Sequence, residues 1–297
     1  MKKAVIAIGS NSTRLLVADC GKTLENRYMG RSETRLFMAL GEDGALDTEA
    51  MERTVRALSA MKLEAESRGA DEITLLATSA TRDAKNADEF ERMIRERTGL
   101  NLRVISGEEE ATCSFFAAAG KNDRAVMDIG GGSTEYTRGV NGEILYVKST
   151  QMGASRLLKS TGINSARDAE KALAIAKETL APAAEEMLRF PKAEKMIGLG
   201  GTCTTAAAIM HGYYPAFEDA EGMTVSLDTA REQLDMLAGM SEEERASVPG
   251  LPVTRVKHMP HGLCILIASM ELLGFDSVTV SDRTILDGYL LKQAPEI

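Results

Sequence analysis

The chain has 297 residues and a formal net charge of −9, because 35 Lys and Arg are set against 44 Asp and Glu. Nucleic-acid-binding domains usually carry a basic surface, so this balance argues against a broad nucleic-acid interface. Trp is absent and aromatic residues are 4% of the chain, which argues against stacking platforms for single strands. The length predicts two domains of roughly 150 residues each.

The chain lacks the marks of membrane insertion or export. No run of about 18 apolar residues is present, so we expect no membrane span and no membrane contact. The apolar run after Met1 ends at Gly9 and is shorter than a signal-peptide core. We therefore expect a cytoplasmic protein. The four cysteines are scattered and form no CxxC pair, which argues against a zinc or disulfide framework. Cys113, Cys203 and Cys264 lie in apolar contexts, which indicates small core residues.

Two segments of the chain repeat one pattern. The sequence IAIGSNST at 6–13 corresponds to MDIGGGST at 127–134. Each has a short apolar strand, a Gly/Ser turn and then a second strand, which predicts a β-hairpin used twice. Small residues let backbone amides approach an anion closely, and successive amides with hydroxyls form an anion-binding nest. The repeat predicts two similar domains that face each other across a cleft.

A third glycine turn, GLGGT at 198–202, lies between an apolar run and a helical segment at 203–210. A turn of this kind offers free amides and the positive end of the helix dipole to a phosphate. The chain contains neither a P-loop motif nor a glycine fingerprint for dinucleotides. Three glycine turns, each followed by Ser or Thr, predict a phosphate site built from amides and hydroxyls.

The remaining pattern is that of an α/β protein. The sequence predicts helices at 47–68, 87–98, 108–119, 166–190 and 262–273, and strands at 73–77 and 102–105. Asp47 or Thr48 can cap the first helix, and Gly69 ends it. Pro182 predicts a kink in the long helix.

The motifs, taken in order, resemble those of one family. They are IGSNS at 8–12, ATSATR at 77–82, ISGEEEA at 105–111, DIGGGSTE at 128–135, GGT at 200–202 and VSD at 280–282. Over nearly the whole chain the sequence resembles the Ppx/GppA phosphatase family of exopolyphosphatases and guanosine pentaphosphate phosphohydrolases. The chain length resembles that of the short, two-domain members.

The resemblance implies an α/β fold of two ribonuclease-H-like domains around a central cleft, as in the actin, Hsp70 and sugar-kinase superfamily. The first domain would cover 1–122 and be completed by a C-terminal helix at about 284–297. The second would cover 123–283. We expect a homodimer only because the resemblance to the family implies one.

The resemblance also assigns roles to side chains. Glu110 matches the catalytic base that activates water, although acidic residues also favour a helix N-terminus for electrostatic reasons alone. Arg82 matches an arginine that grips phosphate; the alternative is a surface arginine paired with Asp83 or Asp88. Further contacts with the substrate would come from Ser10, Asn11, Ser12, Gly131, Gly132, Ser133, Gly201 and Thr202.

A magnesium ion is expected beside the second turn. Asp128 and Glu135 flank this turn, and hard carboxylate ligands suit Mg²⁺, which keeps several waters in its shell. The alternatives are a turn-stabilising contact for Asp128 and a solvent-facing strand position for Glu135. The histidines His258 and His261 form an HxxH pattern, but Pro260 favours a helix start between them rather than a shared metal.

The chain departs from the family at Ala7, where members usually carry Asp. The internal repeat shows the same missing carboxylate, because Ala7 aligns with Asp128. The leading interpretation is an exopolyphosphatase-like hydrolase acting on inorganic polyphosphate with Mg²⁺ and a water activated by Glu110. The alternatives are a guanosine pentaphosphate 5′-phosphohydrolase and a phosphate-chain or alarmone sensor whose turnover is weakened by Ala7. A sugar kinase would need an adenosine pocket and a sugar-side Asp, and neither is apparent.

Overall fold

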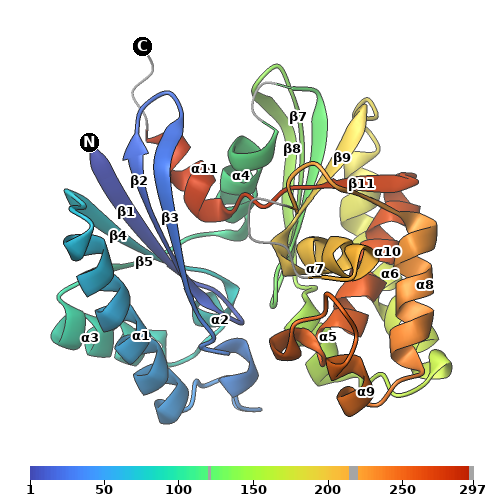
Figure 1. The fold of residues 1–297 in the computed structure, drawn as a ribbon, viewed down its shortest axis with the longest axis horizontal. Helices are drawn as coiled ribbons and strands as arrows, with labels where there is room; N and C mark the ends of the chain where they lie inside the picture. The colour runs from blue at the N-terminus through green and yellow to red at the C-terminus, as the bar shows by residue number, and fades with distance from the viewer. Residues whose placement is uncertain (120–121, 214–219, 294–297) are drawn as a thin grey trace. The chain divides into compact units, whose positions relative to one another are not determined.

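The computed structural model describes residues 1–119, 122–213 and 220–293, and the chain divides into two compact units (Figure 1). Unit 1 contains 1–117 and the returning segment from 285; unit 2 contains 118–284. The sequence interpretation had placed these boundaries at 122 and 284. Residues 294–297 of the expected C-terminal helix lie outside the described residues. Within the described ranges, no helix is long and apolar enough to cross a membrane.

Unit 1 is built on a five-stranded sheet with the order β3-β2-β1-β4-β5. Its strands are β1 (Lys2–Ile8), β2 (Thr13–Cys20), β3 (Leu24–Ser32), β4 (Glu72–Ala77) and β5 (Leu102–Val104). The first three strands form an antiparallel meander, because short turns connect them, whereas β4 and β5 run parallel to β1 after helical crossovers. The carboxyl ends of the parallel strands β1 and β4 therefore lie side by side at the same end of the sheet.

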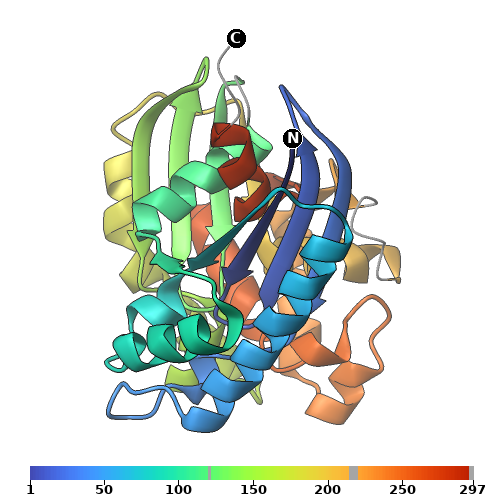
Figure 2. The same ribbon diagram turned by 90° about the vertical axis from the view of Figure 1, so that its left-hand side faces the viewer.

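Helices cover both faces of this sheet (Figure 2). They are α1 (Thr48–Ser67), α2 (Ser79–Arg82), α3 (Ala87–Thr98), α4 (Gly107–Ala118) and α11 (Ile285–Lys292). One apolar cluster packs under α1 and α3, and a second lies against α4 and α11. The predicted cap of α1 is confirmed, since the Asp47 carboxylate accepts from the Ala50 amide at 2.6 Å. Gly99, with φ of +70°, ends α3 where the sequence predicted.

Unit 2 repeats the strand arrangement of unit 1. Its six-stranded sheet has the order β10-β11-β9-β6-β7-β8, with an antiparallel β6-β7-β8 meander and β9 parallel to β6. The strands are β6 (Arg124–Ile129), β7 (Thr134–Val140), β8 (Glu143–Thr150), β9 (Lys195–Leu199), β10 (Thr224–Ser226) and β11 (Ser277–Val280). The two hairpin turns match as well, since Gly9 donates to the Ser12 carbonyl at 3.1 Å and Gly130 to that of Ser133 at 3.0 Å. The internal repeat is therefore a repeat of structure.

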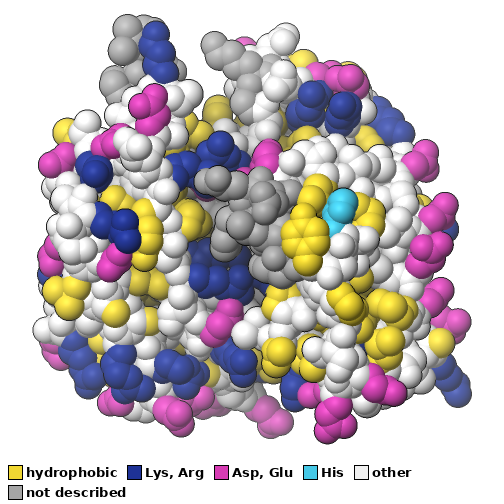
Figure 3. All heavy atoms as spheres, viewed as in Figure 1, with side chains coloured by type: hydrophobic (Ala, Val, Ile, Leu, Met, Phe, Trp, Pro, Cys, Tyr) yellow, Lys and Arg dark blue, Asp and Glu magenta, His cyan; other side chains and the backbone are white. Residues whose placement is uncertain are grey.

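The helices of unit 2 surround one large apolar core. They are α5 (Ala154–Ser160), α6 (Ala166–Met187), α7 (Gly200–His211), α8 (Leu227–Ala238), α9 (Glu242–Ala246) and α10 (Met259–Leu273). The apolar helix α10 is almost entirely buried and packs against α6 and α8. The long helix α6 runs through Pro182 as one element. Acidic and basic side chains both occur on the face drawn in Figure 3.

The C-terminal helix α11 completes unit 1 through a close approach at Gly288. A Cβ atom at this position would collide with the Cys113 carbonyl of α4. We expect Gly288→Ala to destabilise the protein by about 1–3 kcal/mol, the usual cost of overpacking. Urea unfolding would measure the change. Gly239→Ala, where the nearest atoms are 3.8 Å away, is the control. Equal unfolding midpoints for the two variants would contradict this account of the packing.

Candidate active site

The first glycine turn lies between β1 and β2 in unit 1, and its carbonyl groups are held from one side. The Ser10 and Asn11 carbonyls accept from the Phe37 and Arg35 amides, both at 2.8 Å. Because a trans peptide is planar, fixing a carbonyl fixes the direction of the amide that follows it. Among the described residues, the amides of Asn11 and Ser12 have no hydrogen-bond partner. These amides can bind an anion.

Side chains of the first turn extend this polar surface. The Ser10 hydroxyl lies 2.8 Å from the Ser79 hydroxyl at the start of α2. The Asn11 side chain donates to Glu33 at 3.0 Å, and its Oδ1 is buried without a hydrogen-bond partner among the described residues. Buried polar atoms are nearly always satisfied, so this oxygen indicates a donor supplied by a ligand or water.

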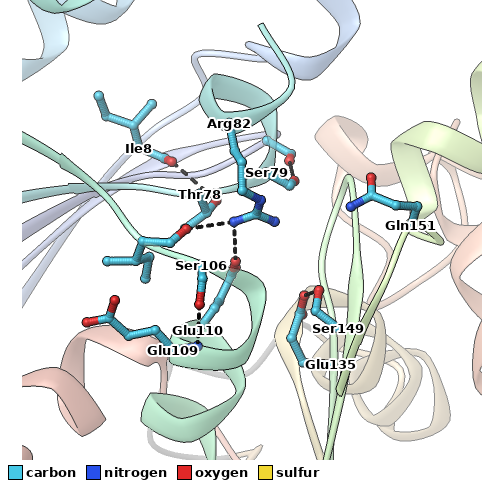
Figure 4. Close-up of polar contacts among 12 residues, drawn as sticks. Ile8, Thr78, Ser79, Arg82, Ser106, Glu109, Glu110, Glu135, Ser149 and Gln151 are labelled. Carbon is cyan, nitrogen blue, oxygen red and sulfur yellow. Dashed lines mark hydrogen bonds and ion pairs between the residues drawn. The ribbon is translucent and has the colours of Figure 1, made fainter. Parts of the chain in front are cut away.

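Arg82 and Glu110 come together from two motifs of unit 1. Arg82 ends α2, and its Nη1 donates to the Ile105 carbonyl at 2.8 Å and lies 3.7 Å from Glu110 Oε2 (Figure 4). Glu110 stands in the first turn of α4, where its amide donates to the Ser106 carbonyl. Its side chain is 12% exposed. Within the described part of the chain, Arg82 Nη2 is buried without a hydrogen-bond partner. A guanidinium in this state is suited to an incoming phosphate oxygen.

These contacts separate the alternatives that the sequence left open in this region. The structure pairs Arg82 with Glu110, whose Oε2 lies 3.7 Å from Nη1. The neighbouring acidic residues differ from Glu110, because Glu108 is exposed and Glu109 forms an ion pair with Arg103. The electrostatic preference for a helix N-terminus accounts for Glu108 and Glu109.

The second glycine turn, at 130–133 in unit 2, is held in the same way as the first. Its carbonyls accept hydrogen bonds from the first turn of α5. The amides of Gly131, Gly132 and Ser133 have no hydrogen-bond partner within the described ranges. In both hairpin turns, the carbonyls are hydrogen-bonded on one side, and the amides of the same peptide units therefore point to the opposite side.

Asp128 and Glu135 are direct partners across β6 and β7, so they lie on the same face of the sheet. Glu135 is 2% exposed, and its Oε1 accepts from the Ser149 hydroxyl at 2.8 Å (Figure 4). Opposed carboxylates repel each other, so a cation between them is stabilising. The described residues contain no group of three or more His, Cys, Asp or Glu that could hold a metal ion. Mg²⁺ takes few protein ligands and keeps waters, so two carboxylates are a chemically suitable donor set for it.

The third glycine turn begins α7 directly beside this carboxylate pair. Gly200 has φ of +85°, and a Cβ atom there would lie 2.5 Å from the Ile129 carbonyl oxygen and 2.9 Å from Asp128 Oδ1. Gly201 lies against the guanidinium of Arg255, which would have to shift to admit a side chain at this position. Nothing in the sequence spacing connects Arg255 with this turn, so its position here is a finding of the structure. The Thr202 hydroxyl lies against Gly262 of α10.

Other reactive residues belong to the packing of the protein. Cys113, Cys203 and Cys264 are buried, as expected for small core residues. Burial raises the pKa of the Cys113 thiol to about 11, so this thiol is protonated at neutral pH. Both ring nitrogens of His261 face backbone carbonyls, which leaves neither of them to a metal.

Comparisons with known proteins show the family and the fold of the chain. The model of the Ppx/GppA phosphatase family matches residues 28–297. The guanosine-5′-triphosphate,3′-diphosphate pyrophosphatase of Vibrio vulnificus is 31% identical over 99% of this chain and 59% of its own length. That of Aliivibrio fischeri is 31% identical over 96% of this chain and 58% of its own length. The chain thus spans somewhat more than half of these relatives.

Solved structures show the same fold. The Ppx/GppA family member of Aquifex aeolicus has a TM-score of 0.82 at 26% identity, and the match covers 99% of this chain and 97% of the other. An exopolyphosphatase from Cytophaga hutchinsonii has a TM-score of 0.86 at 23% identity and 99% coverage of both chains. The actin-like, two-domain α/β fold expected from the motifs is confirmed. The chain belongs to the Ppx/GppA phosphatase family.

Proposed function

We propose that the protein hydrolyses phosphoanhydride bonds and releases the terminal phosphate of inorganic polyphosphate or of guanosine pentaphosphate. One network in unit 1 carries the proposal. Glu110 pairs with Arg82 on α2, and Ser79 at the other end of α2 contacts Ser10 in the first glycine turn. The short helix α2 thereby connects three groups. They are the Glu110 carboxylate, the Arg82 guanidinium, whose Nη2 has no hydrogen-bond partner among the described residues, and the first glycine turn.

Each group has a role in phosphoryl transfer to water. Glu110 accepts a proton from a water molecule whose oxygen attacks the terminal phosphorus, and the bond from that phosphorus to the bridging oxygen breaks. Negative charge in this transition state spreads over three equatorial oxygens. Arg82 Nη2 and the amides of the first glycine turn, which lie in the same unit, donate hydrogen bonds to such oxygens. Because these donors are already oriented, little reorganisation is needed during the reaction.

The carboxylates of unit 2 would hold the magnesium ion. Asp128 and Glu135 supply oxygen ligands, and Ser149 orients Glu135 by its hydrogen bond at 2.8 Å. When bound, Mg²⁺ supplies charge neutralisation for the phosphates. The start of α7 lies beside Asp128, so the amides of this helix add further donors for phosphate oxygens near the pair.

Two substrates are supported by different relatives. The curated relatives at 31% identity are named for guanosine pentaphosphate. A solved relative at 26% identity is described as exopolyphosphatase-like. The same chemistry serves both, because each substrate ends in a phosphoanhydride, and only the contacts to the rest of the substrate differ.

A second candidate function rests on Ala7. This residue is 4% exposed and lies in an apolar cluster with Leu76 and Cys113. Its cross-strand partner is Arg14. No carboxylate stands at position 7, where family members usually carry Asp, so a protein that binds phosphate chains without cleaving them is the alternative.

The direct test is phosphate release from polyphosphate, guanosine pentaphosphate and ATP in the presence of Mg²⁺. General-base assistance is worth ~10²–10⁴-fold, so Glu110→Gln is expected to lower kcat by at least about 100-fold. Glu108→Gln is the matched control, because Glu108 is exposed in the same turn of α4 and is expected to leave kcat unchanged.

Equal turnover of the wild type and Glu110→Gln would remove Glu110 from the reaction. If the wild type binds these chains but releases no phosphate, and Ala7→Asp restores release, the sensor function is correct instead. Phosphorylation of a sugar from ATP would contradict both proposals.

The magnesium assignment has a test that does not depend on turnover. Ligand binding stabilises the folded state by mass action, so Mg²⁺ at ten times its Kd should add about 1.4 kcal/mol to the wild-type unfolding free energy. Glu135→Gln is expected to lose this gain and, without divalent ions, to melt above the wild type, because the repulsion with Asp128 is relieved. Glu143→Gln, at an exposed position of β8, is the control. Retention of the full Mg²⁺ shift in Glu135→Gln would refute the site.

A further inference from the structure

The second glycine turn depends on α5 for its conformation. The Ala154 amide donates to the Gly130 carbonyl at 3.0 Å, and the Ser155 amide donates to the Gly131 carbonyl at 2.8 Å. The Arg156 side chain donates from Nε to the Gly132 carbonyl at 2.7 Å. Three successive carbonyls of the turn are therefore held by three successive residues of α5.

Holding these carbonyls sets the direction of the amides that bind phosphate in the proposed function. Each peptide unit is planar, so the carbonyl of one residue fixes the N–H of the next. The three pinned carbonyls at 130–132 thus direct the amides at 131–133. The contact is also close, because a Cβ atom on Gly153 would lie 2.5 Å from the Gly131 carbonyl oxygen. Any shift of α5 would turn these peptide planes.

The other end of α5 is held by two buried side chains from distant parts of unit 2. His261 Nε2 lies 2.7 Å from the Thr161 carbonyl oxygen, directly after α5. Arg245 of α9 donates to the Ile163 carbonyl at 2.7 Å and to the Leu237 carbonyl at 2.7 Å. Both residues are nearly inaccessible, with exposures of 1% for His261 and 3% for Arg245. Two polar side chains are thus buried in unit 2 to hold the segment 161–163.

The shorter of the two ring contacts of His261 is the one with the segment after α5. Nε2 lies 2.7 Å from the Thr161 carbonyl oxygen and Nδ1 lies 3.0 Å from the Lys257 carbonyl oxygen, so each ring nitrogen faces a hydrogen-bond acceptor. Burial lowers the pKa of His261 from its ordinary value, against the opposing effect of these two carbonyls. In the contact with Thr161 the ring nitrogen is the donor, because a carbonyl oxygen only accepts.

We propose that His261 and Arg245 are positioning residues for the second glycine turn and act on it through α5. The two side chains fix the C-terminal end of the helix, and the N-terminal end then fixes the peptide planes of 130–133. Neither residue touches the turn, so the effect is on the direction of its amides. The consequence for catalysis rests on the proposed function; the effect on the turn does not.

Native-state hydrogen exchange tests the proposal without turnover. His261→Phe removes the donor and keeps a ring. We expect the amides of Ala154, Ser155 and Arg156 to exchange at least about fivefold faster in this variant. Inorganic triphosphate, used as the probe with catalysis prevented by EDTA, is expected to bind several-fold more weakly. His261→Gln keeps a donor of similar reach and should restore both values.

Tyr146→Phe is the matched control, because it removes another side-chain hydrogen bond to a carbonyl in unit 2. The Tyr146 hydroxyl lies 2.8 Å from the Ala183 carbonyl oxygen and 3.2 Å from Glu186 Oε2, both on α6. The Tyr146→Phe substitution should lower the stability of the protein but leave the exchange of the α5 amides and the affinity for triphosphate at their wild-type values. If His261→Phe does not fold, Arg245→Lys gives the same test and should shift both values in the same direction, by a smaller factor.

Three results would overturn the proposal. They are unchanged exchange of these α5 amides in His261→Phe, failure of His261→Gln to restore them, and an equal effect of Tyr146→Phe. If the proposed function itself is wrong, the wild type releases no phosphate, yet the difference in exchange among the variants remains. The two failures are therefore distinguishable.

Discussion

The site depends on the direction of a few peptide planes. A backbone amide binds an anion only when no carbonyl of the protein takes its hydrogen and its plane is held in place. In unit 1 the amides of Arg35 and Phe37 hold the carbonyls of the first turn. In unit 2 the first residues of α5 hold those of the second turn. The glycines make this approach possible, and the partners behind the turn make it rigid.

The two halves of the repeat differ in charge at equivalent positions. Asp128 and Glu135 form a carboxylate pair across β6 and β7. Ala7 and Arg14 form the corresponding pair across β1 and β2. The hairpin of β6 and β7 thereby carries two carboxylates, which suit a cation. The hairpin of β1 and β2 instead carries a cationic side chain next to an apolar one.

Local signals were sufficient to predict much of the fold. The Asp47 cap, Gly99 and the apolar run of α10 act within a few residues, so helix ends and burial were readable from the sequence. The repeat and the motif positions likewise indicated the two hairpins. The contact of Arg82 with Glu110 required the fold, because the two residues meet through the end of β5.

Other parts of the site depend on contacts between distant segments, and sequence patterns do not record these. Arg255 covers Gly201 although no motif joins them. The helix α5 has no motif of its own, yet its amides orient the second turn. His261 was recognisable only as half of an HxxH pattern, whereas the structure places it on a backbone carbonyl.

The central claim, that oriented amides of the hairpin turns bind the phosphates, can be measured directly. Backbone amide resonances of the Glu110→Gln variant would be followed while inorganic triphosphate is added to saturation with Mg²⁺. The account predicts that the largest shifts and the greatest gain in exchange protection fall on residues 11–12 and 131–133. Saturable binding that leaves these amides unchanged and affects another part of the chain would contradict it.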